Sequence, residues 1–309
     1  MSERPPVNLP ASVHDRLLSQ ARSSGRPFAE LLQYFAMERF LYRLSRSPHA
    51  RRFVLKGALM LVAWEAPVSR STRDIDLLGM IDNSVDAVTS VVRDICEMPV
   101  EPDGLTFHAE SAKGRAITED ADYSGVRVTF EGTLGRARVP MQIDMGFGDV
   151  VIPEVTFLDY PVMLDFPAPH LGGYSRESSI AEKFQTMVKL GALNSRMNDF
   201  YDVWFLSRQF HFTGPVLAQA ISTTFAVRRT PMALAASLFF PTFASDPVKA
   251  TQWKAFLARN SLAGAPESFR QTMAAVTAFL EPPALALAAG EGFAYDWNAP
   301  GPWELPHLR

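Results

Sequence analysis

The chain has little cysteine, no long apolar run and almost no net charge. Cys96 is its only cysteine in 309 residues, which excludes an intramolecular disulfide and a cysteine-rich metal site. No signal-peptide pattern and no apolar run of about 20 residues is present, so we expect a cytoplasmic protein without a membrane partner. The formal charge of −3 argues against a surface coated for nucleic acid, although a local basic patch can still bind phosphates.

Repeats, low-complexity segments and the glycine-rich phosphate loop G-x-x-x-x-G-K-S/T are also absent from the sequence. The remaining composition, with 47% hydrophobic and 20% charged residues, is that of an ordinary globular protein. Its length suits one large domain or two smaller ones.

The stretch 51–78 has the strongest local organisation. Phe53 to Leu55 form an apolar run that predicts a strand, and Lys56-Gly57 predicts a sharp turn where backbone can approach a ligand. Residues 58–65 are compatible with a short buried helix. Asp74 and Asp76 then lie two residues apart in a second apolar run.

The Asp-Ile-Asp spacing carries the chemistry of this stretch. Side chains two residues apart on a strand point to the same face, so Asp74 and Asp76 would lie side by side. Mg²⁺ prefers oxygen ligands and is commonly bound by one or two carboxylates together with substrate phosphates. The alternative is a solvated strand edge or turn; the glycine turn and the basic Arg70 and Arg73 favour the metal site.

Asp144 is the next candidate. Val126, Val128 and Phe130 alternate with polar residues, which predicts a half-buried strand, and Gly132 and Gly135 indicate a turn. The returning strand, 139–145, holds Asp144 between apolar neighbours. A buried carboxylate needs a partner, so Asp144 is either a third metal ligand or general base, or a cap for the turn that follows.

The rest of the chain is predicted to be mostly helical, both before and after these strands. The predicted helices cover 13–21, 28–44 and 85–96, and beyond a proline-rich connector at 151–175 they cover 178–190, 196–206, 213–224, 232–238, 246–260 and 266–280. Short strands are also expected at 105–107 and 116–117. The aromatic tail with Phe293, Tyr295, Trp297 and Trp303 is expected to pack back onto the helices.

Basic residues follow the second helix and recur later in the chain. The first group is Arg43, Arg46, His49, Arg51 and Arg52, and Arg228-Arg229 form a later pair. Each is either a solvated basic group or a phosphate contact. Asp199 and Asp202 lie one turn apart near a helix start, where carboxylates also serve as simple caps.

Taken in order, the motifs resemble the AbiEii/AbiGii toxin family of polymerase-β-like nucleotidyltransferases. They read Lys56-Gly57, Arg70-x-Thr72-x-Asp74-Ile-Asp76, Gln142-Ile-Asp144, Glu182-Lys183 and Arg196-x-Asn198-Asp199-Phe-Tyr-Asp202, followed by Gln252-Trp253-x-x-Phe256. The sequence departs from the family pattern in two places. Ala58 follows Gly57 where a second glycine or serine is usual, and Asn198 stands where lysine is common.

The resemblance implies a fold and a set of site residues. The fold is α/β: a nucleotidyltransferase domain with a small mixed sheet over 1–172, and a mostly helical domain over 173–309 that completes the active site. The implied metal ligands are Asp74, Asp76 and, less closely matched, Asp144. Lys183 and Asp199 complete the implied catalytic set, and Lys56, Gly57, Arg70, Thr72 and Lys183 are expected to bind the nucleotide.

The resemblance also implies a function. Members are toxins of toxin–antitoxin and phage-defence systems, so we expect Mg²⁺ or Mn²⁺ as cofactor, a nucleoside triphosphate as substrate and a cognate antitoxin as partner. The expected acceptor is an RNA, the 3′ end of a tRNA, whose modification blocks translation. Two alternatives remain: transfer of a nucleotidyl or phosphoryl group to a protein hydroxyl, and a non-catalytic binding module.

Overall fold

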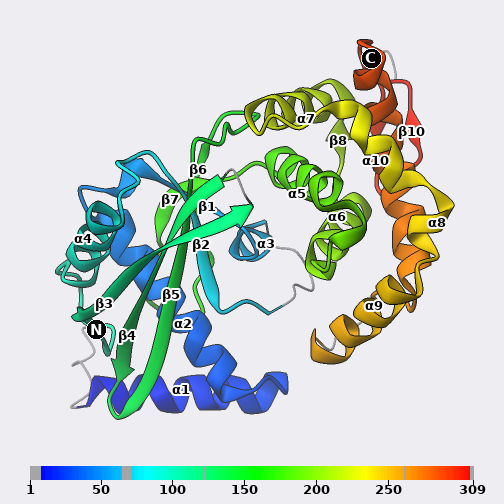
Figure 1. Cartoon of the computed structure of the whole chain (residues 1–309). Helices are drawn as coiled ribbons and strands as arrows, with labels where there is room; N and C mark the ends of the chain where they lie inside the picture. The colour runs from blue at the N-terminus through cyan, green and yellow to red at the C-terminus, as the bar shows by residue number, and fades with distance from the viewer. Residues whose placement is uncertain (1–7, 65–70, 121–122, 261, 263, 307–309) are drawn as a thin grey trace. The chain divides into compact units, whose positions relative to one another are not determined.

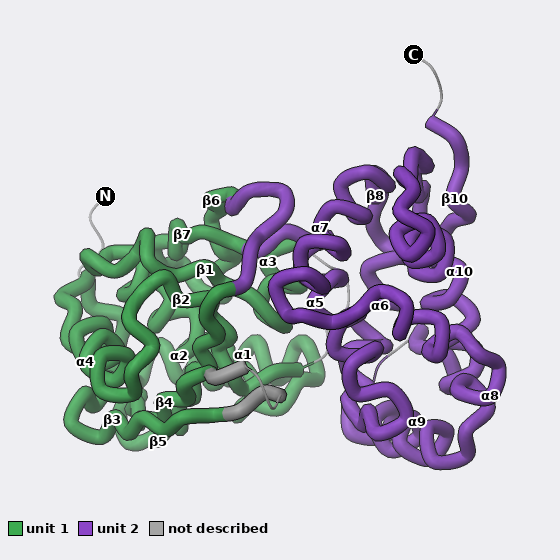
Figure 2. The backbone as a smooth tube through the Cα atoms, turned by 45° about the horizontal axis from the view of Figure 1, so that its top comes forward, with its two compact units in different colours: residues 1–65, 71–148, 156–173 green, residues 66–70, 149–155, 174–309 purple. Residues whose placement is uncertain are grey.

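The computed structural model describes residues 8–64, 71–120, 123–260, 262 and 264–306. These residues form two compact units, shown in different colours in Figure 2. Of the described residues, the first unit holds 8–64, 71–148 and 156–173, and the second holds 149–155 and 174–306. The segment 149–155 therefore belongs to the second unit although the first unit flanks it on both sides in the sequence.

The first unit is a mixed sheet with helices (Figure 1). Its strands are β1 (Phe53–Lys56), β2 (Asp74–Gly79), β3 (Leu105–Asp120), β4 (Tyr123–Leu134), β5 (Ala137–Phe147), β6 (Thr156–Asp159) and β7 (His170–Gly173). Its helices are α1 (Leu9–Ser24), α2 (Phe28–Arg46), α3 (Leu59–Ala63) and α4 (Val85–Cys96), with a 3₁₀ turn η1 (Ala50–Arg52). The seven strands follow the order β3-β4-β5-β2-β1-β7-β6, and β2 runs parallel to β5 while β1 runs parallel to β7.

One face of this sheet is apolar and is covered by helices. Ile75, Ile143 and Val128 lie next to one another on β2, β5 and β4, and all three are fully buried. α2 packs on β5 and α4 on β3 and β4, and Phe40 of α2 meets the ring of Phe130 of β4 with 5.3 Å between centroids. Because side chains alternate along a strand, the residues between these apolar ones point to the opposite face. That opposite face carries the polar residues of the candidate site.

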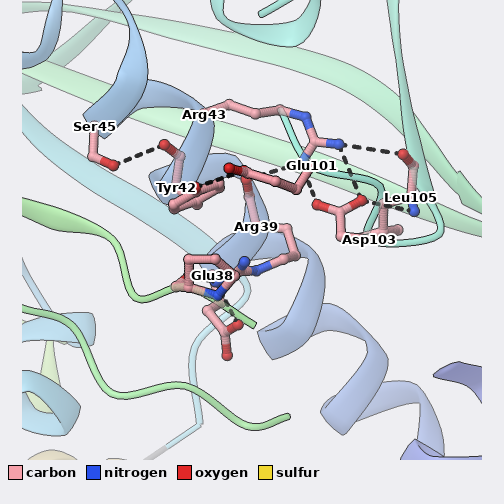
Figure 3. Close-up of polar contacts among 9 residues, drawn as sticks. Glu38, Arg39, Tyr42, Arg43, Ser45, Glu101, Asp103 and Leu105 are labelled. Atoms are coloured by element: carbon pink, nitrogen blue, oxygen red, sulfur yellow. Dashed lines mark hydrogen bonds and ion pairs between the residues drawn. The ribbon is translucent and has the colours of Figure 1, made fainter. Parts of the chain in front are cut away.

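α2 also carries a buried ionic cluster, drawn in Figure 3. Arg43 forms two hydrogen bonds, of 2.6 and 3.1 Å, to the carboxylate of Asp103, and one to the carbonyl oxygen of Leu105. Glu38 and Arg39 are each 1% exposed; Glu38 accepts a hydrogen bond from the Met163 backbone N–H, and Arg39 donates one to the Pro167 carbonyl. The charged side chains of α2 therefore tie the helix to segments distant in sequence.

The second unit is mostly helical. Its helices are α5 (Arg176–Leu190), α6 (Met197–Gln209), α7 (Gly214–Val227), α8 (Pro241–Ala244), α9 (Pro247–Asn260) and α10 (Phe269–Ala288), with 3₁₀ segments η2 (Gly191–Leu193) and η3 (Met232–Phe239). The short strands β8 (Phe212–Thr213), β9 (Asp296–Trp297) and β10 (Trp303–Glu304) form a small antiparallel sheet. The C-terminal tail packs back as expected: Trp303 stacks on Phe279, and Trp297 donates a hydrogen bond to the Ser207 carbonyl.

The predicted fold class is confirmed, and most predicted elements are present with shifted ends. Three predictions of local structure are wrong. The two short strands expected at 105–107 and 116–117 are parts of the single strand β3, with a register shift between His108 and Lys113. Gly132 lies inside β4 against the ring of Phe107, and only Gly135 makes the turn, with φ +58°. The helix expected at 232–238 is the 3₁₀ segment η3.

The described part of the chain contains no helix that is both long and apolar enough to cross a membrane.

The buried Glu38 predicts a pH dependence of stability. Burial, which outweighs the attraction of Arg39, raises the pKa of Glu38 from 4.5 to about 7. The folded state then binds the proton more tightly than the unfolded state, so the free energy of unfolding should fall as pH rises from about 4.5 to about 7, by about 3 kcal/mol from this group. Urea unfolding at a series of pH values measures the slope.

The slope should shrink in Glu38→Gln, whatever the absolute stability of that variant, and should persist in the control Glu30→Gln on the same helix. An unchanged slope in Glu38→Gln would contradict the assignment.

Candidate active site

Four neighbouring strands each carry one charged side chain on the polar face of the sheet, and the four residues are paired in register. Arg127 of β4 pairs in register with Asp144 of β5, and Asp144 pairs with Asp76 of β2. Asp76 in turn pairs with Lys56 of β1. Side chains paired in this way on one face lie on the order of 5 Å apart at Cβ. We call Lys56, Asp76, Asp144 and Arg127 the charge row; Asp74 lies beside it, two residues before Asp76.

Asp144 and Arg127 form a bidentate ion pair within the charge row. The Arg127 Nε donates to Asp144 Oδ1 at 2.7 Å, and Nη2 donates to Oδ2 at 2.6 Å. The Asp144 side chain is 10% exposed and that of Arg127 is 28% exposed. The hydrogen bonds to Asp144 raise the pKa of Arg127, against a smaller effect of burial, and the charges of Asp74 and Asp76 act in the same direction. The guanidinium therefore lies in the field of all three carboxylates.

Gly57 fits closely against Asp76. It adopts φ +72°, a conformation that favours glycine, and a Cβ added there would collide with the Asp76 carboxylate. The predicted turn after Lys56 is present, with α3 beginning at Leu59. Since no side chain intervenes, the backbone of this turn can approach whatever Asp76 binds. Ala58, where the family pattern has a second glycine, precedes α3 in helical conformation with φ −68°.

Thr72 forms hydrogen bonds that hold the backbone at the start of β2. Its backbone N–H donates to the Tyr34 hydroxyl at 3.1 Å, and its own hydroxyl oxygen lies 3.4 Å from the Asp74 backbone nitrogen, which donates to it. Both contacts fix the backbone just before the two carboxylates. The predicted nucleotide contact Arg70 lies outside the described residues.

In the second unit, Lys183 of α5 lies between two carboxylates of α6. Its Nζ is 3.1 Å from Asp199 Oδ1 and 2.8 Å from Asp202 Oδ2. The three side chains are 14%, 8% and 2% exposed, in that order. The lysine and the aspartate of two separate motifs are thus brought together, and Asp202, read from the sequence as a capping residue or a functional one, is the most deeply buried member. A triphosphate that contacted Lys183 would share the ammonium with these carboxylates.

A second buried network includes Glu182, the residue before Lys183 on α5. Arg228 makes two 3.0 Å hydrogen bonds to Asp149, one of 3.1 Å to Gln185, and an ion pair of 3.2 Å with Glu182. Glu182 also accepts a short hydrogen bond from the Tyr174 hydroxyl. This network anchors the turn of α5 that carries Lys183. The sequence analysis assigned no role to Asp149. Its position directly after Gly146-Phe-Gly148, at the end of the strand that carries Asp144, could have indicated a structural or functional carboxylate.

The structure corrects the predictions made for two of the basic residues. Arg228 was expected to be either a phosphate contact or a solvated cation, but its side chain is 9% exposed and bound to Asp149, Glu182 and Gln185. Arg43 was placed in the basic cluster after the second helix, but it is buried against Asp103. Arg46, Arg51 and Arg52 are exposed, as is Arg229.

The donor set near β2 suits a hard divalent cation. Asp74 and Asp76 share a face and their ligand atoms are oxygens, and the Asp76 carboxylate fits against the turn only because residue 57 lacks a Cβ. Within the described ranges, no group of three or more His, Cys, Asp or Glu side chains is arranged to hold a metal ion. Asp144 as a third ligand, and the whole set of site residues, therefore stay predictions.

A comparison of the sequence with protein-family models gives the class of this protein. Residues 39–275 match the family model described as "Nucleotidyl transferase AbiEii toxin, Type IV TA system". This range holds both the Asp74–Asp76 pair and the Lys183–Asp199 pair. The chain belongs to the AbiEii family of nucleotidyltransferase toxins, which confirms the resemblance. Membership implies use of a nucleoside triphosphate and an antitoxin partner.

Two solved structures from H. pylori are similar to this chain. One is a crystal structure of a candidate nucleotidyltransferase, with 14% identity and a TM-score of 0.47, covering 84% of this chain and 95% of the other. The second is JHP933 from Helicobacter pylori, with 14% identity and a TM-score of 0.45, covering 82% and 89%. A search of curated proteins gave no match.

Gly57→Ala tests the close fit between the turn and Asp76. Alanine at positive φ costs about 1–2 kcal/mol by itself, and the collision with Asp76 should add about 1–3 kcal/mol. Chemical unfolding measures both. The matched control is Gly25→Ala, because Gly25 has φ +70° and nothing within 4 Å of an added Cβ. Equal losses in the two variants would contradict the fit.

Lys183→Met tests the buried ion pairs of α5 and α6. The substitution leaves Asp199 and Asp202 buried without this cation, so the free energy of unfolding should fall by about 3–5 kcal/mol. The exposed Lys254→Met on α9 should change it by less than about 0.5 kcal/mol. Adding Asp202→Asn to Lys183→Met should restore part of the loss; a further loss would show that the carboxylate is not balanced by Lys183.

Proposed function

We propose that this chain is a metal-dependent nucleotidyltransferase that transfers a nucleotide from a nucleoside triphosphate to an RNA, the 3′ end of a tRNA. The observation that carries the proposal is the placing of Asp74 and Asp76 on one face of β2, with the Asp76 carboxylate directly against Gly57. Two carboxylates on one face of a strand supply the oxygen ligands that a hard divalent cation prefers, and the glycine turn lets the backbone approach a ligand bound at Asp76.

A divalent cation at Asp74 and Asp76 would supply Lewis acidity and offset the negative charge of the triphosphate. In the proposed reaction, the terminal hydroxyl oxygen of the acceptor attacks the α-phosphorus. The bond from that phosphorus to the bridging oxygen breaks, and pyrophosphate leaves with the bonding electrons. The hydroxyl proton passes to Asp144, as general base, or to solvent.

The remaining roles follow the resemblance, residue by residue. Lys183 would act as a point cation for the triphosphate, and Asp199, at 3.1 Å from its Nζ, would orient that ammonium. Lys56 and Gly57 would place the turn beside the phosphates, and Thr72 would fix the position of Asp74.

An RNA acceptor is supported by the exposed arginines of the first unit. Arg46, Arg51 and Arg52 are exposed within a short segment at the end of α2 and in η1. Contacts from these arginines to phosphates would make RNA binding weaken as salt concentration rises. This local patch is compatible with a chain whose overall charge is −3.

Label transfer tests the proposal. The protein is incubated with Mg²⁺, total tRNA and each α-³²P nucleoside triphosphate in turn. We expect label on tRNA from one nucleotide. Asp76→Asn should lower the rate by about a hundredfold or more, because the cation contributes several kcal/mol of transition-state stabilisation. The control Asp15→Asn changes a carboxylate that is 80% exposed on α1 and should be without effect.

Two other outcomes would favour the alternative functions. Label on protein and not on RNA would replace the RNA acceptor by a protein hydroxyl. Absence of label everywhere, together with absence of a thermal shift from Mg²⁺ and each nucleoside triphosphate, would overturn the proposal and leave a non-catalytic binding module.

A further inference from the structure

The position of Arg127 is not explained by any role proposed so far. It faces Asp144 across β4 and β5 and binds both of its oxygens, at 2.7 and 2.6 Å. Asp144 is the neighbour of Asp76 in the parallel pairing of β2 and β5. Arg127 therefore lies two strands away from Asp74 and Asp76, with Asp144 between them, in the same row and on the same face.

We propose that Arg127 withholds Asp144 from the divalent cation, so that the cation binds through Asp74 and Asp76 alone. This inference rests on the proposed function, in which those two carboxylates hold the cation. In this arrangement Arg127 is a positioning residue: it acts on the cation only through Asp144.

The geometry of the ion pair supports this role. A guanidinium is a planar fork that matches a carboxylate at both oxygens, and such bidentate pairs are among the strongest hydrogen-bonded pairs in proteins. Gln142 adds a weaker contact, with its Nε2 at 3.4 Å from Asp144 Oδ2. With its side chain only 10% exposed, Asp144 has little solvent into which it could turn. A cation that used Asp144 would first have to displace Arg127.

The charges of the charge row also support the proposal that Arg127 withholds Asp144 from the cation. Lys56 and Arg127 flank Asp76 and Asp144, so the four side chains of the charge row sum to zero and Asp74 adds one negative charge. A site with this balance attracts a bare dication less strongly than three carboxylates would. The cation should therefore bind weakly to the protein alone and enter together with the triphosphate, whose oxygens supply the missing ligands.

Mn²⁺ binding without nucleotide tests the inference. The free Mn²⁺ signal in electron paramagnetic resonance gives the Kd for the full-length protein. We expect Arg127→Gln to bind Mn²⁺ about tenfold more tightly than the wild type or better, which corresponds to about 1.4 kcal/mol. The gain should be lost in Arg127→Gln/Asp144→Asn, because the released carboxylate is its source.

Arg115→Gln is the matched control for charge alone. Arg115 pairs in register with Arg127 on the next strand, β3, and is exposed, so this variant removes one positive charge next to the charge row without releasing Asp144. We expect its Mn²⁺ affinity to change by less than about threefold, because an exposed charge is largely screened. Equal gains in Arg115→Gln and Arg127→Gln would overturn the inference in favour of a general charge effect.

The remaining outcomes separate this inference from the proposed function. If Arg127→Gln binds Mn²⁺ no more tightly than the wild type, while Asp76→Asn weakens binding, Arg127 does not withhold Asp144 but the cation site stands. If neither the wild type nor Arg127→Gln binds Mn²⁺ without nucleotide, this inference fails. The proposed function is then decided by label transfer, because its cation can enter together with the triphosphate. Arg127→Lys, which keeps the charge but lacks the planar fork, should give an intermediate gain; it decides the question by the same comparison if Arg127→Gln does not fold by circular dichroism.

Discussion

The repulsion between carboxylates on neighbouring strands is the constraint on which the first unit depends. Asp76 and Asp144 are held side by side because β2 and β5 pair in parallel, and that pairing is fixed by the apolar residues between them. A shift of one residue would move Ile75 and Ile143 out of the core, so the sheet cannot relieve the repulsion by slipping. Relief comes instead from the flanking cations, Lys56 and Arg127.

The second unit also holds two carboxylates close together, but there the cation lies between them. There two carboxylates, Asp199 and Asp202, lie one helical turn apart on α6, and a single lysine from α5 lies within 3.1 Å of both. Arg228 likewise forms ion pairs with two carboxylates, those of Asp149 and Glu182. In both places a buried cation holds two acidic groups together, so much of the charge in this unit serves to align α5 with its neighbours.

The sequence predicted the parts of the fold that depend on local periodicity. The two-residue spacing of Asp74 and Asp76, and the alternation of Val126, Val128 and Phe130, indicated strands with one polar face, and both strands are present. The fold class and the family were also predictable, because several motifs in a fixed order were each readable. The length of β3 was not, because a register shift after His108 interrupts its alternation.

Pairings between distant segments could not be predicted. Arg127 was visible as an outward-facing residue of a strand, but its partner depends on the register of β4 against β5. Arg228 and Asp149 are 79 residues apart in the sequence, and nothing near either one indicates the other. Arg43 looked like part of an exposed basic cluster because its acceptor, Asp103, lies on a loop whose path the sequence does not reveal.

The place of segment 149–155 has a consequence for how the protein is made. On the ribosome, strands β1 to β5 emerge first, and Asp149 follows them directly as part of the other unit. Its partner Arg228 is synthesised only 79 residues later, after β6 and β7 have completed the sheet. Until then the carboxylate of Asp149 cannot form its two hydrogen bonds to Arg228. The network that anchors α5 beside Lys183 is thus among the later parts of the protein to form, and an incomplete chain released before Arg228 would lack it.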